Sequence, residues 1–98
     1  MVGSITGTVL SGLHAASTRI AVAADNIANA STPNYAAKTV QQTSMPSGVQ
    51  ADVVPTEKPV DMAEQLVQAN VASYDFKANI KVLQAAQNLS KHLFDIQA

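Results

Sequence analysis

Residues 13–35 read LHAASTRIAVAADNIANASTPNY, and this stretch decides the fold. Within it, and back to residue 9, apolar side chains recur at alternating steps of four and three, which is typical of a helix that buries one face. The members of this stripe are Val9, Leu13, Ala16, Ile20, Ala23 and Ile27. Pro33 disfavours helical backbone in the residue before it. The pattern therefore predicts a helix over residues 4–30 whose small alanines allow a partner helix to approach closely.

Residues 31–59 follow a different pattern. They contain all four prolines, together with Gly48 and several serines and threonines, and they show no sustained period of 2 or 3.6. This composition indicates an irregular loop, with at most a small β-hairpin formed by residues 38–42 and 50–54.

A second helix is predicted over residues 61–97. It begins with a capping pattern in which Asp61 accepts a hydrogen bond from the amide of Glu64 and the Glu64 side chain reaches back. An apolar stripe follows, again at steps of four and three: Met62, Leu66, Ala69, Ser73, Phe76, Ile80 and Leu83. A neighbouring stripe continues to the C-terminus: Val82, Ala86, Leu89, Leu93 and Ile96. Because the second stripe is displaced around the helix from the first, the two halves of this helix either contact different partners or bury one broad face.

We therefore predict an all-α fold, with residues 1–98 as a single domain of two long antiparallel helices. At 1.5 Å per residue the helices span roughly 37 Å and 54 Å, so the second has apolar surface that the first cannot cover. Charged residues make up 13% of the chain against a usual value of about 25%. Both observations favour a subunit that self-associates through its helix stripes.

Several classes of function are disfavoured. A formal net charge of −1 gives no electrostatic basis for nucleic-acid binding, and cysteine is absent. No apolar run is long enough to predict a membrane span. The start of the chain lacks the basic segment and unbroken apolar run of a cleaved signal peptide. Because motifs for nucleophiles, phosphates and metals are also missing, we expect neither an enzyme nor a cofactor.

The end of the first helix carries the most specific pattern in the chain. Its residues are Asn26, Ile27, Ala28, Asn29, Thr32, Pro33, Asn34 and Tyr35. This pattern resembles the N-terminal signature of the bacterial flagellar rod and hook proteins, and residues 60–96 look like the C-terminal helix of that family. Asn34 stands where the family usually has glycine, and asparagine is the next best residue for left-handed backbone. With so short a middle segment, the chain most resembles a proximal-rod protein.

The resemblance implies a structural subunit of the flagellar basal-body rod, which transmits torque across the periplasm. It implies rod subunits and other basal-body proteins as partners, and export through the flagellar type III apparatus without a cleaved signal peptide. Because helices that are unstable alone become ordered on assembly, we also expect a poorly ordered monomer.

Two alternatives belong to other classes. A cytoplasmic helical-hairpin adaptor or export regulator related to rod proteins would bury the apolar stripes of its helices in a homodimer interface. A small metalloenzyme would use His14 and His92, which come together only if antiparallel helices place them at the same level. His14 has no aspartate, glutamate or cysteine one helical turn away, and Asp95 is the only such residue beside His92, so the sequence shows no full set of metal ligands.

Overall fold

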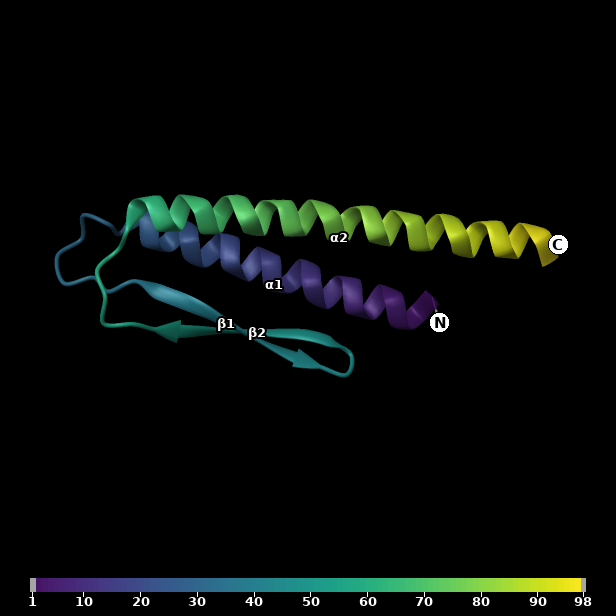
Figure 1. Cartoon of the computed structure of the whole chain (residues 1–98), viewed down its shortest axis with the longest axis horizontal. Helices are drawn as coiled ribbons and strands as arrows, with labels where there is room; N and C mark the ends of the chain where they lie inside the picture. The colour runs from purple at the N-terminus through teal and green to yellow at the C-terminus, as the bar shows by residue number, and fades with distance from the viewer. Residues whose placement is uncertain (1, 98) are drawn as a thin grey trace.

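Two long antiparallel helices form the body of the molecule (Figure 1). The computed structural model describes residues 2–97, with α1 at Val2–Ala28 and α2 at Met62–Gln97. The predicted antiparallel helix pair is thus confirmed. The molecule measures 63 × 22 × 14 Å, and neither of the described helices is long and apolar enough to cross a membrane.

The segment between the helices forms a β-hairpin, so the all-α prediction was wrong. Strand β1 spans Lys38–Met45 and pairs in antiparallel register with β2 at Gly48–Pro55, from Lys38 opposite Pro55 to Met45 opposite Gly48. Strand makes up 17% and helix 65% of the chain. Both strands are longer than the expected pieces at 38–42 and 50–54. The sequence underestimated them because most of their side chains are exposed, which leaves no apolar alternation to detect.

The elements form three layers, with α1 between the hairpin and α2 (Figure 1). Both strands lie against α1, whereas neither has backbone contacts with α2. One side of α1 is thus used by α2 and a second by the hairpin, and the remaining side is free.

Small side chains make up the fully buried part of the contact between the helices. The buried apolar residues of the described chain are six alanines and two valines: Val9, Ala15, Ala16, Val22, Ala23, Ala37, Ala72 and Ala86. At the level of Gly12, an added Cβ would lie 2.8 Å from Asn79 Oδ1, so the helices approach closely there. The pair is held at short range by small residues, with little buried apolar area per residue.

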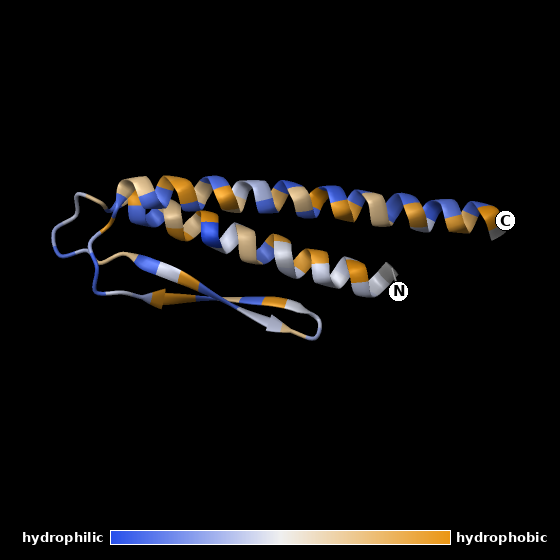
Figure 2. Ribbon diagram, in the orientation of Figure 1, coloured by the Kyte–Doolittle hydropathy of each residue, from blue (hydrophilic) through white to orange (hydrophobic). Residues whose placement is uncertain are grey.

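The far end of α2 extends past the start of α1 (Figures 1 and 2). At 1.5 Å per residue the 27 residues of α1 span about 40 Å and the 36 residues of α2 about 54 Å. Apolar bands continue along this overhang (Figure 2), and Leu89, Leu93, Phe94 and Ile96 are all exposed there.

Candidate functional site

A buried asparagine joins three elements of the fold. Asn26 near the end of α1 is 0% exposed. Its Nδ2 donates to Lys38 O at the start of β1 (2.8 Å) and to Gln65 Oε1 on α2 (2.9 Å). Its Oδ1 accepts from Lys38 N (2.9 Å) and from the Tyr35 hydroxyl (3.3 Å). Both donors and both acceptor positions of the amide are therefore used.

We call Asn26, Tyr35, Lys38 and Gln65 the asparagine junction. The sequence pattern marked Asn26 and Tyr35 at the end of the first helix, and the structure shows that Asn26 reaches across to the hairpin and α2. Lys38 and Gln65 were missed because they lie 12 and 39 residues away from Asn26. The only available signal was an asparagine on the buried side of an apolar helix, which requires hydrogen-bond partners.

The turn after α1 is formed by local bonds. Asn29 Nδ2 donates to Asp25 O (2.9 Å), and the Thr32 hydroxyl donates to Asn29 Oδ1 (3.2 Å). Pro33 follows Thr32 and is exposed, as is Ala28 at the helix end. Asn34 has φ of 62°, the left-handed conformation that asparagine tolerates better than most residues. These bonds turn the chain back so that Tyr35 reaches the asparagine junction.

The tip of the hairpin is fastened to α1 at a second point. Ser11 Oγ accepts from Val49 N (3.1 Å) and donates to Thr8 O (2.7 Å). The Thr8 hydroxyl donates to Ser47 O at 3.4 Å. Gly48 has φ of +142°, and a Cβ there would collide with the Ser11 side chain. We call Thr8, Ser11 and Gly48 the tip latch.

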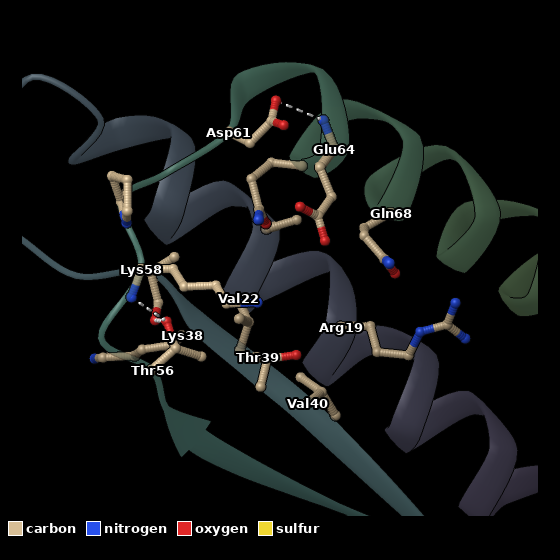
Figure 3. Close-up of a pocket in the computed structure, with 14 residues that line it drawn as sticks. Arg19, Val22, Lys38, Thr39, Val40, Thr56, Lys58, Asp61, Glu64 and Gln68 are labelled. Atoms are coloured by element: carbon tan, nitrogen blue, oxygen red, sulfur yellow. Dashed lines mark hydrogen bonds between the residues drawn. The ribbon is translucent and has the colours of Figure 1, made fainter.

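An open cavity of about 310 Å³ lies beside the asparagine junction (Figure 3). Arg19 and Lys58 line it together with the acidic side chains of Asp61 and Glu64. Glu64 N donates to Asp61 Oδ1 at 3.3 Å, which gives the first half of the predicted cap. The described hydrogen bonds include no return bond from the Glu64 side chain, which lines the cavity instead. Because basic and acidic side chains both line the cavity, it suits polar contacts with another protein better than a small ligand of a single charge.

An ion pair crosses between the helices next to this cavity. Arg19 Nη1 lies 2.7 Å from Asp75 Oδ2, with the Arg19 side chain 17% and the Asp75 side chain 53% exposed. Because the aspartate is half in water, the pair adds orientation more than stability.

The structure places the predicted packing residues in two groups. Those that are buried or half-buried along the helix contact are Val9, Leu13, Ala16, Ile20, Ala23, Ile27, Ala69, Phe76, Ile80 and Leu83. The other four are exposed on α2: Met62, Leu66, Leu89 and Leu93. The exposed group therefore has no role in the contact between the helices of one chain, and its role in assembly stays a prediction.

The two histidines do not share a level along the helix pair. His14 lies near the Gly12 and Asn79 contact, whereas His92 is 13 residues beyond Asn79 on α2, a distance of about 20 Å along the helix. Among residues 2–97 no three potential ligands from histidine, aspartate and glutamate gather in one place. The geometry on which the metalloenzyme alternative depended is therefore not found.

Comparison with known proteins gives one family. A family model described as flagella basal body rod protein matches residues 8–35, which is 28 of the 98 residues. No curated protein matches the chain. The matched segment begins at Thr8 of the tip latch, includes Asn26 and ends at Tyr35. The match confirms the resemblance to flagella basal body rod proteins that was drawn from residues 13–35.

Proposed function

We propose that this protein is a structural subunit of the flagellar basal-body rod, which polymerises through its two helices and transmits torque. The observation that carries the proposal is the position of residues 8–35, the segment that the family model matches. The segment contains the α1 residues that fasten the hairpin: Thr8 and Ser11 at the tip, and Asn26 at the base. The family match therefore coincides with the residues that build this three-layer unit.

Torque transmission requires a subunit that resists twisting and sliding. The asparagine junction and the tip latch hold the hairpin to α1 at both of its ends, while Gln65 ties α2 to the same point. Directional hydrogen bonds at separated positions fix the register of the layers more strictly than apolar contact alone. This arrangement supports a subunit that moves as one body within an assembly.

Export through a type III apparatus, without a cleaved signal peptide, is part of the same proposal. Passage through a narrow channel requires a chain that unfolds readily. The fully buried apolar residues are mostly alanines, and small side chains contribute little burial free energy each. Partners would be neighbouring rod subunits and other basal-body proteins, and the location would be the rod that crosses the periplasm.

Quantitative mass spectrometry of purified hook and basal-body complexes tests this function. We expect the chain in these complexes at a fixed number of copies per basal body, and depleted from the cytoplasm of the same cells. An Asn26→Ala variant should be lost from the complexes, whereas Asn29→Ala, which removes only local bonds of the turn, should remain. Recovery of the unmodified chain from the cytoplasm alone would contradict the proposal and favour the adaptor.

A further inference from the structure

The side of α2 that faces away from α1 carries an uncovered apolar row, which we call the outer stripe. Its large members lie on one face of the helix. They recur at helical spacing when the alanines at positions 78 and 85, which occupy the gaps between them, are counted with them. These members are Val67, Val71, Tyr74, Val82, Leu89 and Ile96, and all of them are exposed. Ala72 and Ala86, which are buried in the helix pair, lie on other sides of the helix.

The outer stripe is large enough to form a specific interface. Its six large side chains are between 45% and 73% exposed. They present on the order of 700 Å² together, close to the roughly 800 Å² that each partner contributes to a standard protein interface. An apolar surface of this size on a small chain marks a place of protein contact.

The free side of α1 offers a matching surface on a second copy of the chain. Exposed residues recur there at steps of four and three, and most of them are small: Gly3, Gly7, Ser17, Ala21, Ala24 and Ala28, with the larger Leu10 and His14 between Gly7 and Ser17. A Cβ added at Gly3 or Gly7 would meet nothing within 4 Å. Large side chains of one helix pack closely on a face of small ones. The two surfaces also agree in length, at about 44 Å for the outer stripe and about 38 Å for the α1 face.

Charge next to these surfaces favours the same pairing. Asp25 borders the α1 face, and Lys81 borders the outer stripe, three residues after position 78. In the described chain the one ion pair joins Arg19 and Asp75, so Asp25 and Lys81 have no ionic partner. Contact between the two surfaces brings opposite charges to one interface. An antiparallel two-fold pairing of outer stripes would instead bring Lys81 beside Lys81 of the second copy, since it lies near the stripe's midpoint.

We infer that the outer stripe of one copy packs on the free α1 face of the next copy. Because the two surfaces differ, a pair of copies leaves one of each uncovered, and the association continues beyond a dimer to a ring or an open filament. The inference rests on the proposed function and specifies which faces meet.

Cysteine cross-linking of mixed variants tests this contact, since the natural chain has no cysteine. We would mix Val82→Cys with Leu10→Cys or with Ala21→Cys and treat each mixture with a short bis-maleimide. We expect the yield of cross-linked dimers between the two different variants to be at least fivefold higher than the yield of dimers between two copies of either variant. Gln84→Cys, which is exposed on α2 outside the outer stripe, is the matched control. Cross-links mainly between two Val82→Cys chains, or no excess over the control, would overturn the inference.

Sedimentation velocity gives a second, independent reading. Val82→Glu should weaken self-association at least tenfold, while Gln84→Glu adds the same charge outside the outer stripe and should leave association unchanged. Circular dichroism at a concentration high enough for both variants to associate checks that both can form the helices. Unchanged association of Val82→Glu would overturn the inference. These measurements use the purified chain, so they can fail while the chain is still found in basal bodies, and the two failures are distinguishable.

Discussion

Asn26 on α1 and Gln65 on α2 meet across the helix pair, where Asn26 Nδ2 donates to Gln65 Oε1 at 2.9 Å. Both side chains are buried. A polar contact of this kind within an apolar helix interface fixes the register of the two helices, because any axial shift leaves buried polar groups without partners. The same Asn26 also holds the hairpin, so one residue sets the positions of α2 and β1 together.

Removing the Asn26 amide should therefore be costly. Asn26→Ala leaves the Lys38 backbone and the Gln65 side chain without their partners, and we expect a loss of about 2–3 kcal/mol in the free energy of unfolding. Urea unfolding in trimethylamine N-oxide, followed by circular dichroism, measures it. Asn29→Ala, which removes only local bonds of the turn, should cost about 1 kcal/mol or less. Equal losses for the two variants would show that the asparagine junction is not central.

The tip latch should control the local opening of the hairpin. Ser11→Ala removes the acceptor of the Val49 amide, so exchange of that amide with deuterium should become at least fivefold faster. The global free energy of unfolding should fall by only about 1 kcal/mol. Ser17→Ala, at an exposed position on α1, is the control and should leave the Val49 amide unchanged.

The closeness of the helices should make their contact intolerant of larger side chains. Ala72 is 0% exposed, and Ala72→Leu must push the helices apart, at a cost of about 1–3 kcal/mol in unfolding free energy. Ala63→Leu adds the same atoms at an exposed position of α2 and should be nearly neutral. Thermal melting of both variants under the same conditions makes the comparison. A tolerated leucine at position 72 would mean that the pair is loosely packed.

The turn after α1 should accept glycine and reject a branched residue. Asn34 has φ of 62°, so Asn34→Gly should change the unfolding free energy by less than about 0.5 kcal/mol. Asn34→Val should cost about 1–2 kcal/mol, because a β-branched side chain resists left-handed backbone. Denaturant titration of the two variants is the measurement, and a neutral valine would contradict the turn geometry.

Helicity of the chain should depend on its concentration. A core of alanines and valines contributes little, whereas many large apolar side chains remain exposed. We expect a dilute monomer to melt gradually and helical content to rise as the chain associates. A sharp, cooperative melt at low concentration, independent of concentration, would oppose this prediction.

The helix pair could be predicted from the sequence because helical apolar repeats depend only on local spacing. The stripe from Val9 to Ile27 indeed lies along the contact. The hairpin was underestimated because it is held through backbone bonds to Asn26 and Ser11 rather than by an alternating apolar face. Such bonds do not require an alternating pattern of apolar residues in the sequence of the strands.

The free face of α2 shows a second limit of the sequence. Spacing alone grouped Met62 and Leu66 with the contact residues, since all of them fit one heptad pattern. The structure shows that Ala72 and Gln65 are buried in the contact instead, and that another row, which includes Val67 and Val71, faces outward. A helix that is apolar on more than one side does not reveal from its sequence which side its own chain covers.

The alanine-based contact between the helices also has a thermal consequence. The heat capacity change and the denaturant sensitivity of unfolding both scale with the area newly exposed to water. Since six of the eight buried apolar residues are alanines, the isolated pair should unfold with a small heat capacity change and a shallow denaturant slope. Its stability should then vary little between cold and warm conditions, and most of the temperature dependence should belong to the step in which copies associate.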